Sequence, residues 1–246
     1  GPVVVLVHGV GIGAWAFDEV AAGLVSDHRV LVPHRRGYGP FDEKVEVPRS
    51  ASVTEQVDDM LGLLGARGIW DATLVGVSGG ATLVSALAMA APGIVRAAVI
   101  HEPVLGPLAP ELHALLQAAV ARLASAAGAG ADGVRGFMSG LVGEERMATL
   151  PPPALREILR RAQVLRAEVP EFAAFAPSAV DLSGLSKMPV VTSVGSRSPQ
   201  CRHLAAGVLT QLASATMEVL DGVRHLPQLE APKAFEVVIR AVAGGR

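Results

Sequence analysis

Thr73-Leu74-Val75-Gly76-Val77-Ser78-Gly79-Gly80-Ala81-Thr82 starts as an apolar, strand-type run and continues in small residues typical of a closely packed helix. The spacing Gly76-x-Ser78-x-Gly80 predicts a nucleophile elbow, in which a strand turns sharply into a helix and holds one serine in a strained backbone conformation at the carboxyl edge of a sheet. Glycine suits both flanking positions because a Cβ there would collide with the neighbouring strand and helix. We therefore expect Ser78 to project into a cleft.

The same motif can also mark an ordinary glycine-rich turn, since the chain contains 27 glycines. Two features favour the elbow: a buried-type strand before it, and the helical run 79–91 after it, whose small residues permit close packing of helix on sheet. A catalytic interpretation further requires a histidine and a carboxylate that can meet Ser78.

Composition indicates a single globular domain, or one domain that carries an insertion. The 246 residues are 50% hydrophobic and 18% charged, which is enough apolar material for a large core and excludes a disordered chain. The net charge is −2 and no block of lysine and arginine occurs, so neither nucleic acid nor an anionic membrane is an expected partner. A small, neutral substrate is the expectation.

Cysteine usage and hydropathy narrow the class further. Cys201 is the only cysteine, so an internal disulfide framework is excluded, and no cysteine and histidine residues have zinc-type spacing. We predict no metal and no cofactor. No apolar run reaches membrane-spanning length and no basic leader precedes the first strand, so we expect a cytoplasmic protein without membrane association. The oligomeric state stays open, with a homodimer as one option.

Strand-type and helix-type segments alternate through most of the chain. Strands are predicted at 3–7, 28–33, 73–77, 95–101, 189–194 and 216–220, and helices at 14–25, 53–67, 79–91, 200–212 and 232–242. Such alternation predicts right-handed crossovers and a mostly parallel, twisted sheet flanked by helices.

The alternation stops after Glu102, where helices are predicted at 108–127, 131–142 and 154–168 with no strand between them. This predicts a helical cap at 104–185, inserted into an α/β core formed by 1–103 and 186–246. Apolar residues of the cap could wall a substrate pocket, although such helical stripes are more often plain core. The wall would include Val104, Leu105, Leu108, Phe137, Met138, Leu141, Phe172 and Phe175. We expect Val104, Leu108, Met138 and Leu226 to contact substrate.

Three residues that could perform chemistry follow predicted strands. Ser78, Glu102 and His225 all lie at carboxyl ends, where open parallel sheets gather their functional groups. A serine hydroxyl is a poor nucleophile near neutral pH and needs a base that is oriented by a third group. His225 is the predicted base because it follows the last strand in a loop with Gly222, although it could instead be a surface imidazole.

Together these motifs resemble the α/β-hydrolase superfamily over essentially the whole chain, apart from the opening hairpin of that fold. The matching pieces are His8-Gly9-Val10, the elbow, Arg36-Gly37-Tyr38-Gly39, and Gly222-Val223-Arg224-His225. The resemblance implies that the backbone N–H groups of Val10 and Gly79 form an oxyanion hole. It also implies that His8, Arg35 and Arg36 are structural.

The acid departs from the common pattern of that superfamily. Most members carry an aspartate soon after the strand that ends here at Val194, but this chain has Gly195-Ser196-Arg197-Ser198 there. We prefer Glu102 because some members place their acid after the preceding strand, and because Pro103 is expected to hold Glu102 extended. His101 should then face the opposite side of the strand. Asp221, near His225 in sequence, is the alternative acid.

A closer resemblance is to the fungal zearalenone lactonases and their relatives. It rests on Gly76 to Ala81, Val99 to Glu102, Val194 to Pro199 and His225-Leu226-Pro227. That family uses Ser, Glu and His in this order and hydrolyses a macrolactone without a cofactor. Its cap supplies a tryptophan, whereas Trp15 and Trp70 of this chain lie outside the predicted cap, so we carry over the triad and not the substrate.

The predicted function is a cofactor-free serine hydrolase acting on a hydrophobic carboxylic ester or lactone through Ser78, His225 and Glu102. Because the base must be neutral, activity should fall as pH drops through about 6 to 7. Two alternatives stay open. A non-catalytic protein of the same fold could bind a ligand in the pocket, and a lyase or cofactor-free oxygenase could use the scaffold without Ser78 as nucleophile.

Overall fold

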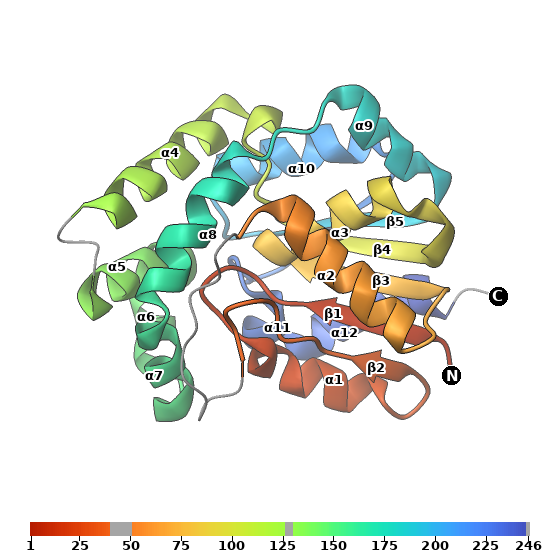
Figure 1. Ribbon diagram of the computed structural model, residues 1–246, viewed down its shortest axis with the longest axis horizontal. Coiled ribbons are helices and arrows are strands. Elements are labelled where there is room, and N and C mark those ends of the chain that lie inside the picture. The colour runs from red at the N-terminus through yellow and green to blue at the C-terminus, as the bar shows by residue number, and fades with distance from the viewer. Residues whose placement is uncertain (40–50, 126–129, 245–246) are drawn as a thin grey trace.

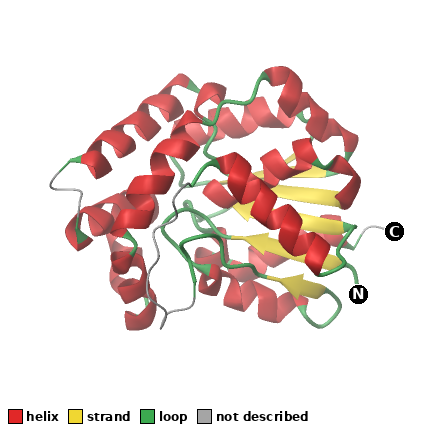
Figure 2. Cartoon of the chain, in the orientation of Figure 1, coloured by secondary structure: helices red, strands yellow, loops and turns green. Residues whose placement is uncertain are grey.

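A computed structural model describes residues 1–39, 51–125 and 130–244. Its centre is a six-stranded sheet of order β2-β1-β3-β4-β5-β6, in which every neighbouring pair is parallel (Figures 1 and 2). The strands are β1 (Val3–Val7), β2 (Arg29–Leu31), β3 (Ala72–Val77), β4 (Val95–His101), β5 (Val190–Gly195) and β6 (Thr216–Leu220). The predicted parallel sheet is confirmed.

Helices cover both faces of this sheet. On one face, α1 (Asp18–Leu24) packs against α12 (Pro232–Ala243) (Figure 1). On the other face, α2 (Val53–Ala66) packs against α3 (Gly79–Ala90). Beside them, α10 (Gln200–Leu212) covers β5 and β6. The short helix α11 (Pro227–Glu230) precedes α12. Short 3₁₀ turns at Ala14–Phe17, Pro92–Ile94, Gly106–Leu108 and Gly184–Lys187 join these elements.

The central strands are apolar because both of their faces are covered. All residues of β3 are buried, and so are Val4 to Val7 of β1, which matches the continuous β-branched runs expected of a doubly covered parallel sheet. The edge strand β6 exposes most of its residues. The core therefore lies around β1, β3 and β4, and it fixes the ends of these strands beneath the site.

The elbow has the predicted backbone. Ser78 has φ 56° and ψ −123° between β3 and α3, a conformation that side chains rarely adopt. A Cβ at Gly80 would overlap the carbonyl oxygen of Val7, and one at Gly76 would overlap the backbone of Gly80 and Ala81. Glycine at these two positions lets β1, β3 and α3 approach closely enough to hold Ser78 in its strained geometry.

A block of helices separates β4 from β5. It contains α4 (Pro110–Ala124), α5 (Ala131–Val142), α6 (Glu144–Thr149), α7 (Pro152–Arg160), α8 (Ala162–Ala174) and α9 (Ala179–Ser183). Figure 1 shows α4 to α8 beyond the carboxyl ends of the strands. The single helix predicted over 154–168 is wrong, because the chain breaks at Arg161 into α7 and α8. The end of the helix predicted to reach residue 127 lies outside the described residues.

A buried polar cluster joins α8 to the core. Glu168 forms an ion pair with Arg35 and accepts a hydrogen bond from the Tyr38 hydroxyl at 2.5 Å. Arg35 also donates to Gln56 at 2.9 Å, and Gln56 donates to Glu168 at 3.4 Å. These side chains are nearly inaccessible to solvent, so the cluster fixes the block of helices above the sheet.

Among the described residues, no helix combines the length and apolar character that a membrane crossing requires.

Candidate active site

His225 and Glu102 form a buried hydrogen-bonded pair at the carboxyl edge of the sheet. Nδ1 of His225, in the loop between β6 and α11, lies 2.6 Å from Oε2 of Glu102, the residue that follows β4. Both side chains are almost fully buried. With the proton on Nδ1 donated to the carboxylate, Nε2 of the neutral ring is an acceptor. Nε2 is buried and has no hydrogen-bond partner in the described part of the chain.

Glu102 reaches this position through a turn that the sequence did not suggest. The prediction that Pro103 holds it extended is wrong, because Glu102 has φ 45°. This left-handed residue breaks the alternation of side chains, so the expectation that His101 faces away is also wrong: Nε2 of His101 lies 3.6 Å from Oε1 of Glu102. Burial lowers the pKa of His101 to about 4, so that ring is neutral near pH 7.

The other carboxylate contacts come from the loop after β5 and from α10. Oε1 of Glu102 accepts hydrogen bonds from the backbone N–H of Gly195 at 2.9 Å and the hydroxyl of Ser198 at 2.5 Å. Nε of Arg202 lies 3.3 Å from Oε2. Ser198 thus stands where the resemblance expects an acid, and it binds the acid supplied by β4. Asp221, the alternative, is exposed and accepts a hydrogen bond from Ser196 instead.

The electrostatic environment keeps the Glu102 carboxylate ionised and the His225 imidazole neutral. Burial alone would raise the pKa of Glu102, but the hydrogen bond and charge of His225, with His101 and Arg202, hold it well below its usual range. Burial lowers the pKa of His225, and the positive charge of Arg202 lowers it further against the opposing pull of Glu102. Near pH 7 the pair is therefore a carboxylate beside a neutral imidazole.

Ser78 lies under the loop that follows β1. A Cβ at Gly9 would be 3.1 Å from Cβ of Ser78, and one at Gly79 would be 2.6 Å from Cγ2 of Val10. Val10 and Gly79 therefore adjoin each other beside Ser78. Gly79 is the first residue of α3, where the amide has no partner within the helix. The two residues that the resemblance assigns to the oxyanion hole therefore lie beside the serine.

His8 and Tyr38 hold that loop from behind. Nε2 of His8 accepts a hydrogen bond from the backbone N–H of Arg35 at 3.3 Å, and its Nδ1 lies 2.9 Å from the carbonyl oxygen of Gly9. The hydroxyl of Tyr38 accepts from the N–H of Gly11 at 2.8 Å. Burial and the charge of Arg35 keep the pKa of His8 well below its usual value, which suits this bracing role. The loop is fixed without participation of the Ser78 side chain.

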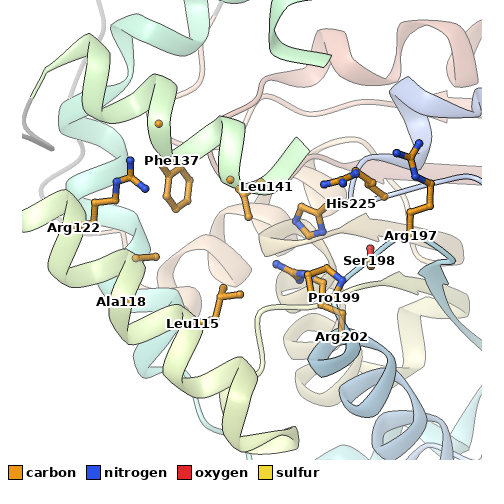
Figure 3. Close-up of a pocket in the computed structure, with 14 residues that line it drawn as sticks. Leu115, Ala118, Arg122, Phe137, Leu141, Arg197, Ser198, Pro199, Arg202 and His225 are labelled. Atoms are coloured by element: carbon orange, nitrogen blue, oxygen red, sulfur yellow. The ribbon is translucent and has the colours of Figure 1, made fainter. Parts of the chain in front are cut away.

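Two adjoining cavities lie above these residues. The smaller, about 40 Å³, is lined by Ser78 with Val10, Val104, Leu115, Leu116, Ala119, Phe137, Leu141, Val169, Phe172 and Arg202. The larger, about 270 Å³, contains His225 and is shown in Figure 3. There α4 contributes Leu115, Ala118 and Arg122 on one side, while His225, Ser198, Pro199 and Arg202 lie opposite. The cavities share Leu115, Ala119, Phe137, Leu141 and Arg202, so they form one continuous site.

A sequence-family model described as "Alpha/beta hydrolase family" matches residues 4–237. The chain belongs to the alpha/beta hydrolase family. Similar solved structures include a thermophilic esterase from Thermogutta terrifontis, with a TM-score of 0.80 and 22% identity, covering 98% of this chain and 89% of that one. The carboxylesterase CesB from Bacillus subtilis has a TM-score of 0.79 and 20% identity, covering 100% of this chain and 85% of that one.

An enol-lactonase from Burkholderia xenovorans LB400 is also similar, with a TM-score of 0.73 and 19% identity, covering 100% of this chain and 92% of that one. At these identities the likeness concerns the fold. No curated protein sequence matches the chain. The α/β-hydrolase fold expected from the motifs is therefore confirmed, and the closer lactonase resemblance stays a prediction.

Within this alpha/beta hydrolase, the predicted substrate contacts are only partly brought together. Val104 lines the cavity that contains Ser78. Leu108, Met138 and Leu226 are not among the residues that line either of the two cavities, and Met138 packs instead beside Gly11. Their roles in substrate binding stay predictions. Phe137, Leu141 and Phe172, expected in the apolar wall, do line the site.

Sequence reasoning missed the cationic residues of this hydrolase site. Arg202 contacts Glu102, and Arg122, Arg197 and Arg224 line the cavity that contains His225. Two of them could have been found, because Arg224 directly precedes the predicted base and Arg197 lies in the loop after β5. Arg122 could not, since it comes from a cap helix whose orientation the sequence does not define.

Among the described residues, no three His, Cys, Asp or Glu side chains are grouped as metal ligands.

Proposed function

We propose that this protein is a serine hydrolase that cleaves carboxylic esters or lactones of small molecules. Ser78 is the nucleophile, His225 the general base and Glu102 the residue that orients His225. The observation that carries the proposal is the 2.6 Å hydrogen bond between Nδ1 of His225 and Glu102, which leaves Nε2 unpartnered in the described part of the chain. The cavity that contains His225 adjoins the one that Ser78 lines at the strained elbow.

The proposed reaction has two steps. Nε2 of His225 takes the proton of the Ser78 hydroxyl as Oγ attacks the ester carbonyl, and then gives that proton to the departing alkoxide. Water attacks the resulting acyl-enzyme with His225 again acting as base, which restores free Ser78. No hydrogen bond joins Oγ of Ser78 to Nε2 in this structure. Catalytic contacts of this kind often tighten only when substrate is bound.

The backbone N–H groups of Val10 and Gly79 are the proposed oxyanion donors. Both adjoin Ser78, and their positions are fixed by the braced loop and by the start of α3. Fixed donors stabilise the developing charge without reorganisation, and the loss of one such donor typically costs about 3 kcal/mol of barrier. Substitution of the side chains tests these donors poorly, because the donating groups are backbone N–H groups that every substituted residue other than proline retains.

Cavity shape supports a short acyl group. The 40 Å³ beside Ser78 is about three times what one water molecule needs by the same measure, and its lining is almost entirely apolar. We propose an acyl part of a few heavy atoms there. A lactone, or a macrolactone like that of the resembling family, would have to extend into the larger cavity.

A fluorophosphonate probe tests the nucleophile. We expect the probe to label the folded protein once, at Ser78, and the label to disappear in Ser78→Ala together with the hydrolysis of 4-nitrophenyl acetate. Tight ligand binding without labelling would instead identify a non-catalytic binding protein. Turnover that survives Ser78→Ala would identify a lyase or oxygenase on the same scaffold.

A paired substitution tests the acid. Glu102→Gln keeps the shape but removes the charge, so kcat should fall by about 10⁴-fold, the loss found when the acid of such a triad is neutralised. Asp221→Asn should change kcat less than about twofold, because Asp221 contacts Ser196 rather than His225. A large loss in Asp221→Asn with activity retained in Glu102→Gln would overturn the assignment.

A further inference from the structure

The two parts of the site differ sharply in charge. The cavity around Ser78 is apolar except for Ser78 and Arg202. The cavity around His225 is lined by Arg122, Arg197, Arg202 and Arg224 and by no aspartate or glutamate among the described residues. This contrasts with a whole chain whose net charge is −2. The cavity around His225 is therefore lined by positive charge although the chain as a whole is slightly acidic.

Nearby acids leave most of this charge uncompensated. Glu102 neutralises Arg202, through contacts of 3.3 Å from Nε to a carboxylate oxygen and from Nη1 to the backbone carbonyl. Glu230 lies near Arg224, but its carboxylate accepts the backbone N–H groups of Arg224 and Leu226. In the described part of the chain, the guanidinium groups of Arg197 and Arg224 have no ion pair or hydrogen bond.

Arg122 lines the same cavity from the side opposite His225. It reaches the cavity from α4 (Figure 3), and it also borders an adjacent hollow that contains Asp132, Glu144 and Arg135. That hollow places both acidic and basic side chains around Arg122. The strongest anion attraction should come from Arg197 and Arg224, which lie in the two loops that carry Ser198 and His225. Arginine suits this task because its planar fork can donate two parallel hydrogen bonds to a carboxylate or phosphate.

The direction of the reaction decides which part of a substrate meets the arginines. The histidine of a serine hydrolase protonates the leaving oxygen, so the alcohol part must lie on the histidine side of the scissile bond. In this site that side is the arginine-lined cavity, whereas the acyl part faces the small apolar cavity at Ser78.

We propose that the natural substrate is a short-chain acyl ester whose alcohol part carries an anionic group, a carboxylate or a phosphate, held by Arg197 and Arg224. The inference rests on the proposed function and narrows its substrate class. It replaces the expectation of a neutral substrate, which came from the net charge and from the absence of a block of lysine and arginine. Net charge does not report how charges are placed around one cavity.

Three matched acetyl esters test the inference: 4-acetoxybenzoate, 4-acetoxyphenyl phosphate and the neutral 4-acetoxybenzamide, each rate divided by its rate of hydroxide-catalysed hydrolysis. At low ionic strength we expect kcat/KM for at least one anionic ester to exceed that for the amide by about 10-fold or more. Whichever anionic ester is faster identifies the carboxylate or the phosphate. Added salt should reduce this preference and leave the amide rate nearly constant.

Charge removal locates the effect. Arg197→Met and Arg224→Met should each lower the ratio of anionic to neutral kcat/KM by about 3-fold, and the double variant by more. Arg122→Met should change it less. Arg67→Met is the matched control. Arg67 follows α2 at the amino edge of the sheet, so this substitution removes the same charge far from the cavity. Its ratio should equal that of the wild type.

The outcomes separate the inference from the function on which it rests. If the amide is cleaved as fast as the anionic esters, with labelling at Ser78, the protein is a serine hydrolase and the inference is wrong. A salt-independent preference, or one that Arg67→Met reduces equally, also contradicts it. If no ester is cleaved and Ser78 is not labelled, the proposed function itself fails.

Discussion

At the scale of single residues, the site depends on how His225 and Glu102 are surrounded. The Glu102 carboxylate contacts His225, Gly195, Ser198, Arg202 and His101. One of them, Arg202, lowers the pKa of both the Glu102 carboxyl group and the His225 imidazole through its positive charge. The same cation therefore keeps the acid ionised and the base neutral.

The pH dependence of activity follows from this environment. The proposed base works as neutral imidazole, so kcat/KM should be constant above the pKa of His225 and fall tenfold per pH unit below it. Burial and Arg202 lower that pKa from its ordinary 6.5, so the acidic limb should lie below pH 6.5 rather than between 6 and 7. Measurement of kcat/KM for a neutral ester from pH 4.5 to 8 checks this. A midpoint at or above 6.5 would contradict the assigned environment.

Ser198 provides a second prediction. Ser198→Ala removes the 2.5 Å hydrogen bond to Oε1 of Glu102, and bonds to charged groups are worth roughly 1.5–3 kcal/mol. We expect kcat to fall about 10-fold with little change in KM, because the carboxylate is less firmly held. Ser183→Ala, which removes an exposed hydroxyl bonded to a backbone carbonyl, is the control and should be neutral. Equal kcat in the two variants would show that Ser198 does not position Glu102.

At the scale of elements, the elbow depends on close approach between β1, β3 and α3. Gly80→Ala would place a methyl group against the carbonyl oxygen of Val7, so at least one element must shift. Overpacking of this kind costs typically 1–3 kcal/mol and here lies against the backbone. We expect urea unfolding to show a loss of at least about 2 kcal/mol, together with weaker labelling of Ser78.

The matched control is Gly62→Ala in α2, where a Cβ meets open space. Alanine is the better helix former by roughly 0.5–1 kcal/mol, so this variant should be slightly more stable than the wild type. If both variants were equally stable, the close approach at Gly80 would not be required for the fold.

Elements with strong periodicity were predictable, and special backbone positions were not. The strands β1, β3, β4 and β5 were predicted to within about one residue, because a doubly covered parallel strand is a nearly continuous apolar run. The short helices α6, α9 and α11 were missed, since four to six residues contain too few turns to show a pattern. The φ of 45° at Glu102 was missed because nothing in Glu-Pro predicts a left-handed residue.

The residues of the site divide in the same way. Ser78, Glu102 and His225, the proposed triad, were predicted because each follows a strand, and strand ends can be read from the sequence. Contacts supplied by other elements, such as Arg202 on Glu102 or Arg122 in the cavity, depend on how α10 and α4 are oriented. Helix orientation is set by tertiary packing, which a single sequence does not reveal.

At the scale of the whole molecule, the buried cluster around Glu168 joins the inserted helices to the core. Glu168→Ala would leave Arg35 charged and unpaired at a position that is only 5% exposed. Breaking a buried pair by removal of one partner typically costs about 3–5 kcal/mol. We expect a loss of that size in urea unfolding, with the hydrolase site disturbed through Tyr38 and the loop at Gly11.

Asp59→Ala is the control for this experiment. It removes one of the acidic partners of Arg36, in a surface pair whose acid side chain is about half exposed, 49%, and such pairs contribute at most about 1 kcal/mol. Comparable losses in the two variants would indicate that Glu168 does not anchor the inserted helices.

The positions of Ser78 and Glu102 on neighbouring strands have a consequence for how this protein can diversify. The backbone N–H of Ser78 donates to His101 on β4 at 2.9 Å, and that of Glu102 donates to Ser193 on β5 at 3.2 Å. The sheet ladder therefore fixes the spacing between the proposed nucleophile and the proposed acid. Substitutions in the helices between β4 and β5 that keep Glu168 and its partners can therefore change the lining of the cavity while the sheet holds the proposed nucleophile and acid at the same spacing.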